Sequence, residues 1–177
     1  TECLEEQEIC FLQLDVTKDD AGVLIINSIK NQFKNKEKKI DVIVHAAGIT
    51  KDKTLKRMDG LTFDKVMDVN FNSVVNIDKQ LIENNALADD CRIVSMASTS
   101  GVAGNFGQTN YSASKSGLMG YSQVMSKKYK TFSWNCIAPG FIQSDMTKNL
   151  PVMTRIVAKR FMSPLGVPGI PGDVAKA

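Results

Sequence analysis

Short apolar segments alternate with longer segments of helical periodicity along most of this chain. The run IDVIVHAAG at residues 40–48 is mostly apolar and ends in glycine, which is typical of a parallel strand buried on both faces. We expect further strands at 9–15, 91–98 and 132–138, helices around 20–35, 62–84, 109–130 and 147–161, and a last helix capped by Asp173. This alternation predicts one α/β domain over residues 1–177, a doubly wound parallel sheet with helices on both faces.

Three of the predicted strands end in residues suited to a binding site. Asp15, Gly48 and Ser98 each stand at the carboxyl end of a strand, and a glycine-rich loop runs from Gly101 to Gly107. In parallel sheets of this type, ligands bind in the crevice beyond the carboxyl ends of the strands. We therefore expect the loops that carry these residues to converge on one crevice.

The composition is typical of a water-soluble globular domain and excludes several classes of function. Of 177 residues, 43% are hydrophobic and 23% are charged. No apolar run approaches the roughly 20 residues that span a bilayer, and the first ten residues lack the pattern of a secretory signal. The net charge of +3 is too small to indicate nucleic-acid binding. We expect no membrane or nucleic-acid partner, and a cytoplasmic location with an organellar matrix as the alternative.

The cysteines and the one histidine do not form a metal-binding pattern. Cys3, Cys10, Cys91 and Cys136 include no C-x-x-C pair, and His45 is the only histidine available to a zinc site. Cys10, Cys91 and Cys136 lie in or beside apolar segments, so we expect them to be buried, reduced thiols. We expect His45 to pack or form a hydrogen bond in its strand, and we predict no metal site.

A serine, a tyrosine and a lysine stand at a spacing that suits acid–base chemistry. Ser98 precedes Tyr111 and Lys115, and the last two are four residues apart, which places them on one face of a helix. A cation beside the phenol lowers its pKa, so Tyr111 can act as a general acid or base on an alcohol or a ketone. Because Tyr and Lys stand four apart on many helices, the spacing alone does not distinguish a catalytic pair from chance neighbours.

The surrounding motifs make that distinction. The ordered motifs are DVT (15–17), AAGIT (46–50), VN (69–70), Ser98, GNFGQTNYSASK (104–115) and NCIAPGF (135–141). This set resembles the short-chain dehydrogenase/reductase superfamily over nearly the whole chain. The runs AGITKDKTLKRM and PGFIQSDMT resemble more narrowly the beta-ketoacyl-(acyl-carrier-protein) reductases, and LPVMTRIVAKR resembles their high-molecular-weight subgroup.

The resemblance implies a catalytic set of Asn70, Ser98, Tyr111 and Lys115. Tyr111 would protonate the substrate oxygen as hydride arrives from a nicotinamide, and Ser98 would hold that oxygen by a hydrogen bond. Lys115 would bind the nicotinamide ribose and lower the pKa of Tyr111, while Asn70 would anchor a water molecule that resupplies protons. Each role is consistent with a reaction in which the cofactor carries the hydride, while the protein positions the reactants and supplies protons.

The resemblance also implies a cofactor, NADP(H) or NAD(H), and a set of residues around it. Besides Tyr111 and Lys115, these are Asp15, Val16, Ala47, Gly48, Pro139, Gly140, Ile142 and Ser144. The implied substrate is a beta-ketoacyl thioester carried by acyl carrier protein or coenzyme A, reduced to the beta-hydroxyacyl form in fatty acid biosynthesis. The implied assembly is a homotetramer or dimer built on residues 62–84 and 109–130.

The chain departs from the family pattern because the glycine-rich T-G-x-x-x-G-I-G turn, which holds the pyrophosphate, is missing. Relative to the doubly wound layout, about two βα units before Asp15 and the closing elements after Ala177 are missing. We expect these residues to belong to a longer protein; the alternative, a true fragment, would expose a sheet edge.

Two alternatives to the main functional hypothesis stay open. One is a reductase of another secondary alcohol or ketone, and the other is a non-catalytic subunit or fragment of the same fold. Basic residues are compatible with docking of an acidic carrier protein, although a solvated surface is the simpler interpretation. These are Lys51, Lys53, Lys56, Arg57, Lys148, Arg155, Lys159 and Arg160.

Overall fold

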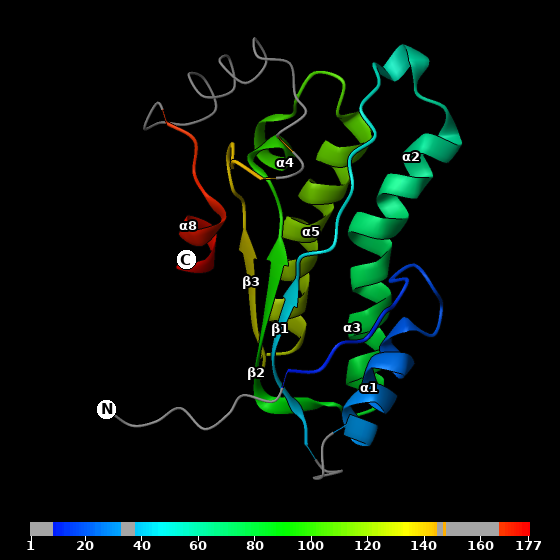
Figure 1. The fold of residues 1–177 in the computed structure, drawn as a ribbon, viewed down its shortest axis with the longest axis vertical. Helices are drawn as coiled ribbons and strands as arrows, with labels where there is room; N and C mark the ends of the chain where they lie inside the picture. The colour runs from blue at the N-terminus through cyan, green and yellow to red at the C-terminus, as the bar shows by residue number, and fades with distance from the viewer. Residues whose placement is uncertain (1–8, 33–37, 145–146, 148–166) are drawn as a thin grey trace.

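The computed structural model describes residues 9–32, 38–144, 147 and 167–177. Its sheet has three parallel strands in the order β1-β2-β3, with β1 at Ile40–His45, β2 at Leu87–Met96 and β3 at Ser133–Ile137 (Figure 1). Val44 of β1 pairs with Val94 of β2. The predicted α/β class with a parallel sheet is confirmed, and the arrangement is consistent with a Rossmann-like fold.

Helices fill both connections between the strands and also stand before β1 and after β3. They are α1 (Ala21–Gln32), the short 3-10 helix η1 (Leu55–Arg57), α2 (Gly60–Met67), the π-helical turn η2 (Asp68–Asn72), α3 (Ser73–Glu83), α4 (Thr99–Ala103), α5 (Thr109–Lys128) and α8 (Pro171–Ala175). α2, η2 and α3 together form the helix predicted at 62–84, and α5 forms the one predicted at 109–130. The helix predicted at 147–161 lies outside the described residues, apart from its first residue. Asp173 lies inside α8, where its carboxylate accepts a hydrogen bond from the Ile170 amide at 2.8 Å.

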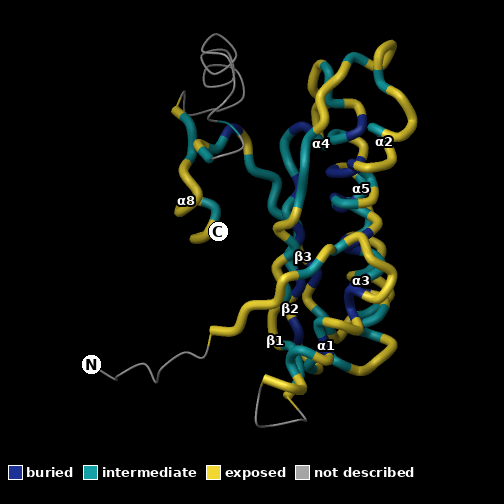
Figure 2. The backbone as a smooth tube through the Cα atoms, turned by 45° about the vertical axis from the view of Figure 1, so that its right-hand side comes forward, coloured by how far each residue is buried: buried dark blue, intermediate teal, exposed yellow. Residues whose placement is uncertain are grey.

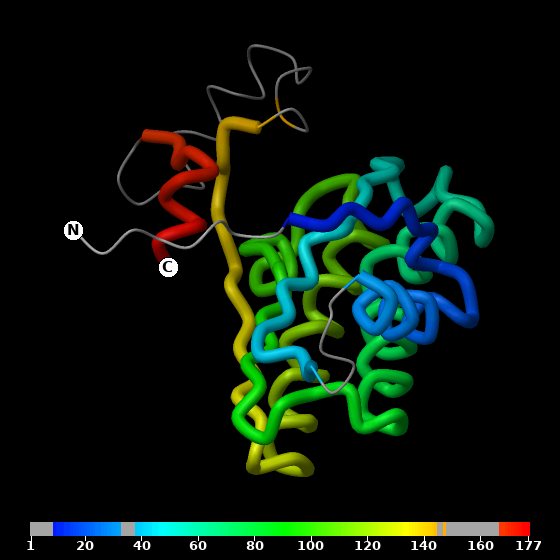
Figure 3. The backbone as a smooth tube through the Cα atoms, turned by 60° about the horizontal axis from the view of Figure 1, so that its bottom comes forward, coloured from blue at the N-terminus to red at the C-terminus, as the bar shows by residue number. Residues whose placement is uncertain are grey.

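In the described part of the chain, α1, α3 and α5 all lie on one face of the sheet (Figure 3). Ile43, Ile93 and Trp134 point to this face and are half-buried or buried. Val42 and Val44 alternate with them and point the other way, where their side chains are 53% and 58% exposed. The expectation that helices cover both faces, and that β1 is buried on both, is therefore wrong for these residues.

The predicted strand at residues 9–15 is also absent, because these residues have no regular secondary structure. Ile9, Cys10 and Phe11 are exposed, as Figure 2 shows for the segment that leads away from the N-terminus. In the doubly wound layout, the strand predicted at 9–15 would be the third along the chain and would pair with the second. Among the described residues, no strand takes the place of that second strand. An apolar run without a neighbouring strand has no partner for its backbone groups, so it stays extended and open. The burial expected for Cys10 is wrong for the same reason.

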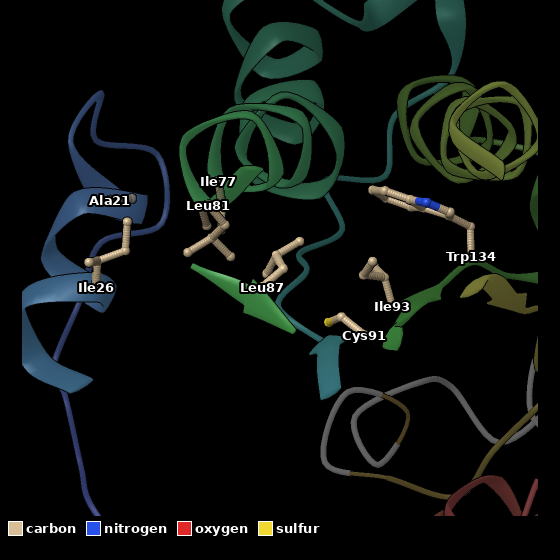
Figure 4. Close-up of a cluster of buried hydrophobic side chains, with 8 residues drawn as sticks. All are labelled: Ala21, Ile26, Ile77, Leu81, Leu87, Cys91, Ile93 and Trp134. Carbon is tan, nitrogen blue, oxygen red and sulfur yellow. The ribbon is translucent and has the colours of Figure 1, made fainter. Parts of the chain in front are cut away.

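The core lies between β2 and the helices that cover it. Its buried members are Ala21, Ile26, Ile77, Leu81, Leu87, Cys91, Ile93 and Trp134 (Figure 4). Full burial of a side chain such as Leu81 or Ile93 contributes about 2 kcal/mol of transfer free energy. Burial also raises the pKa of the Cys91 thiol to about 11, which keeps it protonated and inert, as expected for a core cysteine.

Two polar contacts join the core elements to one another. Gln80 of α3 accepts a hydrogen bond from the Val23 amide at 3.0 Å and donates to the Asp19 carbonyl at 2.7 Å, which fixes the start of α1. His45 of β1 is hydrogen-bonded through Nε2 to Asp78 of α3 at 2.8 Å. The hydrogen-bonding role predicted for His45 is confirmed.

The helices of the described ranges include none that is long and apolar enough to cross a membrane. Those ranges also contain no group of three or more histidine, cysteine, aspartate or glutamate side chains that could hold a metal ion.

Candidate active site

Asn70 is the buried centre of a hydrogen-bonded connection between β1 and α5. It lies in η2, whose wider π-helical turn interrupts an otherwise continuous helix, a feature often found at functional sites. Its Oδ1 accepts from the Ile49 amide at 2.8 Å, and its Nδ2 donates to the Ile49 carbonyl at 3.0 Å and to the Ser114 hydroxyl at 3.1 Å. The Ser114 hydroxyl donates in turn to the Tyr111 carbonyl at 2.8 Å. Asn70 therefore links the loop after β1 to the helix turn that carries Tyr111.

Lys115 is buried in α5, and its ammonium group lies at the carboxyl end of β2. Its Nζ donates to the Met96 carbonyl at 2.6 Å. Gly48 lies beside this group, since a Cβ atom on Gly48 would be in van der Waals contact with it, 3.5 Å from Lys115 Nζ and 3.4 Å from Asn70 Oδ1. The structure thus brings together Gly48, Asn70 and Lys115, three of the residues predicted for the site.

Ser98 and Tyr111 approach each other from two different elements. Ser98 is the N-cap of α4, and its Oγ accepts a hydrogen bond from the Ser100 amide at 3.1 Å. Tyr111 lies in the first turn of α5, and the Ser98 hydroxyl is close enough to its phenol to lower the pKa of that group. Thr99, which follows Ser98, donates its amide proton to the Pro139 carbonyl at 3.0 Å. This bond brings the loop after β3 to the same end of the sheet as Ser98.

The electrostatics of Tyr111 differ from the expectation. Burial raises the pKa of the Tyr111 phenol, the hydrogen bond with Ser98 lowers it in part, and Asp52 raises it further, so the net direction is upward. Lys115 Nζ lies 5.5 Å from the centroid of the Tyr111 ring and is directed to the Met96 carbonyl. The predicted lowering of the pKa of Tyr111 by Lys115 is therefore wrong for this structure, because burial is the largest cause of the shift and Lys115 is not among the groups that produce it. Burial also lowers the pKa of Lys115.

The other residues predicted to border the cofactor, besides Gly48, Tyr111 and Lys115, fall into three groups, which are a pair that lines a hollow, the exposed Asp15, and the residues that follow β3. Val16 and Ala47 line one hollow of about 390 Å³ that also includes side chains of α1, β1 and α3. Asp15 is exposed and bonded to its own turn, through the Thr17 amide at 3.0 Å and the Thr17 hydroxyl at 2.7 Å, and these bonds lower the pKa of its carboxyl.

The third group follows β3. Pro139 contacts the Ser98–Thr99 turn as described above, and Gly140 is exposed. Ile142 forms an isolated bridge with Gly169, and the Ser144 amide donates to the Thr147 hydroxyl at 2.9 Å. The contacts that the structure gives for Ile142 and Ser144 thus join them to Gly169 and Thr147, and not to Tyr111 or Lys115.

Two buried residues beside Tyr111 were not singled out by the sequence. Asn110 and Ser114 both have no exposed surface, and both bond to the Tyr111 backbone. Their positions next to Tyr111 and Lys115 in the motif GQTNYSASK were the only available signal, because their partners at residues 51, 62 and 70 are distant in the chain.

The arrangement can support proton transfer to a bound oxygen atom. A phenol, a hydroxyl close to it and a buried ammonium group lie at the carboxyl ends of parallel strands, where ligands bind in sheets of this type. Lys115 can hold a further polar group, such as a pair of sugar hydroxyls, because its ammonium has donors left beyond the Met96 bond.

Comparison with known proteins agrees with this geometry. The sequence profile of the short chain dehydrogenase family matches residues 1–154. The chain is 36% identical to "3-oxoacyl-[acyl-carrier-protein] reductase FabG" of Chlamydia trachomatis, over 97% of this chain and 68% of the relative. It is 39% identical to the protein of the same name of Rickettsia felis, over 92% and 70%, and 35% identical to the "Acetoacetyl-CoA reductase" of Cupriavidus necator, over 93% and 69%. The chain therefore belongs to the short-chain dehydrogenase family of oxidoreductases.

Proposed function

We propose that the protein reduces a beta-ketoacyl thioester to the beta-hydroxyacyl thioester with a reduced nicotinamide cofactor, NADPH or NADH. The observation that carries the proposal is the close approach of the Ser98 hydroxyl to the Tyr111 phenol, with Lys115 Nζ 5.5 Å from the centroid of the Tyr111 ring. Catalysis by proton transfer requires the donor to be within hydrogen-bond reach of the reacting oxygen. A ketone oxygen placed between Ser98 and Tyr111 satisfies that requirement.

Tyr111 acts as the general acid in this proposal. The upward direction of its pKa keeps the phenol protonated near neutral pH, which is the form that ketone reduction needs. The bound nicotinamide supplies the hydride, and Ser98 holds the substrate oxygen during the transfer. As the oxygen gains negative charge it withdraws the phenol proton, so both hydrogen bonds are stronger in the transition state than in the ground state.

Lys115 and Asn70 support this step from the buried side of the site. Lys115 would hold the ribose of the nicotinamide beside Gly48 while it keeps its bond to Met96. Both protons of Asn70 Nδ2 are used by Ile49 and Ser114, so a water molecule would be anchored through the remaining lone pair of Oδ1. Val16 and Ala47, together with Asp15, Gly48, Pro139, Gly140, Ile142 and Ser144, remain the proposed cofactor residues.

The names of the relatives support the thioester as substrate, since two are reductases of 3-oxoacyl groups on acyl carrier protein and one reduces acetoacetyl-CoA. We propose the same partner here, a carrier-bound acyl thioester, and a homo-oligomer formed through α2–α3 and α5 in the cytoplasm. Val124 on α5 supports such an interface because it is 62% exposed. Of the basic residues considered for carrier docking, Lys51, Lys53, Lys56 and Arg57 are exposed, and the group from Lys148 to Arg160 lies outside the described residues.

The experiment is a substrate comparison with the intact protein. Oxidation of NADPH and of NADH is followed by absorbance with acetoacetyl-CoA, an acetoacetyl carrier protein, and a panel of simple ketones and sugars. We expect turnover with the acetoacetyl thioesters and at least tenfold lower kcat/KM with the simple ketones. Higher kcat/KM with a simple ketone supports the alternative of another secondary alcohol or ketone. Failure of every substrate, with the cofactor bound, supports the non-catalytic alternative.

A further inference from the structure

Asn110, the residue before Tyr111, forms hydrogen bonds with three backbone groups. Its side chain has no exposed surface. Its Oδ1 accepts a hydrogen bond from the Tyr111 amide at 2.8 Å, and its Nδ2 donates to the Lys51 carbonyl at 3.1 Å and to the Thr62 carbonyl at 3.4 Å. One side chain thus joins the loop after β1, the helix α2 and the first turn of α5.

The hydrogen bond from the Tyr111 amide to Asn110 satisfies a backbone group in the first turn of α5. The first amide groups of a helix have no partner within the helix, and a side-chain oxygen at the N-cap normally satisfies one of them. Here the N-cap residue Gln108 makes no such bond. Its side chain donates instead to Asp52 at 2.9 Å, and Asn110 satisfies the Tyr111 amide in its place.

The two hydrogen bonds that Asn110 donates hold the first turn of α5 against Lys51 and Thr62. The loop after β1 is also attached to the chain before α5 at a second point. The Lys53 amide donates to the Gly107 carbonyl at 2.9 Å, next to the Gln108–Asp52 contact. Loop residues 51–53 are therefore connected to the chain just before Tyr111, at Gly107, Gln108 and Asn110. Movement of the first turn of α5 would break these bonds and leave buried or backbone polar groups unsatisfied, which is unfavourable.

Lys115 is held in a different way. Its Nζ is bonded to Met96 on β2, and a Gly101-to-Ser116 backbone contact fixes α5 at that level. Loss of Asn110 therefore weakens the attachment of the turn that carries Tyr111, which then keeps only the Ser114 bond to its carbonyl and the contacts of Gly107 and Gln108, and leaves the turn that carries Lys115 in place.

We propose that Asn110 is a positioning residue that sets the Tyr111 phenol at hydrogen-bond distance from Ser98 by fixing the first turn of α5 to the loop after β1. The inference rests on the proposed reductase function of Tyr111. It predicts a specific separation of effects, in which the rate of the chemical step falls while binding of the cofactor, assigned to Lys115 and the residues around Gly48, does not.

The test compares Asn110→Ala with Asn84→Ala in the intact protein. Asn84 is a matched control because its side chain also bonds to a backbone carbonyl, that of Gln80 at 2.8 Å, at the opposite end of the sheet. We measure kcat and KM with the best substrate, the dissociation constant of the cofactor by fluorescence, and the folded fraction by circular dichroism. We expect Asn110→Ala to lower kcat at least tenfold with cofactor affinity within twofold of wild type, and Asn84→Ala to leave both unchanged.

Three outcomes overturn the inference in a wild-type protein that is active. They are a kcat for Asn110→Ala within twofold of wild type, an equal loss of cofactor affinity, and a loss of kcat that only matches the loss of folded protein. If Asn110→Ala does not fold, Asn110→Ser, which removes both donations but keeps a polar side chain, is judged by the same criteria. A wild-type protein that binds the cofactor and reduces no substrate instead overturns the proposed function.

Discussion

Gly101 and Ser116 pack backbone against backbone, with no room for a side chain between them. A Cβ atom on Gly101 would lie 2.8 Å from the Ser116 nitrogen and 2.9 Å from the Lys115 carbonyl carbon, closer than real contacts allow. Gly101 belongs to α4, whose N-cap is Ser98, and Ser116 follows Lys115 in α5. This contact therefore sets the distance between the two elements that carry the proposed site.

Gly101→Ala should separate α4 from α5 and so reduce both stability and activity. Overpacking of a tight contact costs about 1–3 kcal/mol. Gly120→Ala is the matched control, because a Cβ there meets nothing within 4 Å and alanine is the better helix former. Thermal unfolding and turnover of both variants check the prediction. Equal behaviour of the two variants would show that α4 and α5 do not require this close approach.

The buried pair of His45 and Asp78 should contribute far more to stability than an exposed pair on the same helix. The side chains of His45 and Asp78 are 9% and 1% exposed, and burial together with the nearby Asp78 raises the pKa of the Tyr121 phenol, so Asp78 lies beside side chains of both β1 and α5. Removal of one partner of a buried pair costs about 3–5 kcal/mol, whereas exposed pairs are worth about 0–1 kcal/mol. Denaturant unfolding should therefore show a loss of about 3 kcal/mol for Asp78→Ala.

The control for this prediction is Glu83→Ala in the exposed Lys79–Glu83 pair, which should lose less than about 1 kcal/mol. Comparable losses in the two variants would mean that the buried pair adds nothing beyond a surface contact.

Asp59 should give the protein a pH-dependent contribution to stability. Its Oδ1 caps α2 by accepting from the Thr62 amide at 2.7 Å, and its Oδ2 lies 3.0 Å from Lys53 Nζ. These bonds hold the pKa of Asp59 well below its usual value of 3.8. A lowered pKa contributes stability above the unfolded value, and the contribution is lost as the pH falls from about 4 toward the folded value.

Asp59→Ala should accordingly lower the unfolding midpoint at pH 7, and the difference from wild type should shrink as the pH falls below about 4. Asp64→Ala, in the same helix, serves as the reference for removal of an exposed carboxylate. A difference between Asp59→Ala and wild type that is constant from pH 7 to pH 3 is the outcome that contradicts this prediction.

Much of the fold follows from hydrophobic periodicity, because local patterns determine where helices and strands form. The helix α5 and the strands β1 and β3 lie close to where the pattern predicts them. The segment at 9–15 shows the limit of this reasoning. Its apolar run is typical of a buried strand, but burial depends on a neighbouring strand, and the described residues provide none.

The sequence predicts members of the candidate site but not the connections between them. The motif spacing identified Ser98, Tyr111 and Lys115, whereas the contacts of Asn110 with residues 51 and 62 join segments far apart in the chain and have no local signature. The pKa of Tyr111 was predicted in the wrong direction because the sequence shows the nearby lysine but not the burial of the phenol, which is the larger effect.

The central claim is that the Tyr111 phenol donates the proton to the substrate oxygen. The most direct measurement is kcat of Tyr111→Phe in the intact protein, with acetoacetyl thioester as substrate and saturating reduced nicotinamide. This substitution removes only the hydroxyl group, so the helix and the ring remain. We expect Tyr111→Phe to lower kcat by a factor of about 10²–10⁴, which is the usual contribution of a positioned proton donor, and to leave the circular dichroism spectrum unchanged. A variant that keeps more than a tenth of the wild-type kcat would contradict the assignment of Tyr111 as the proton donor.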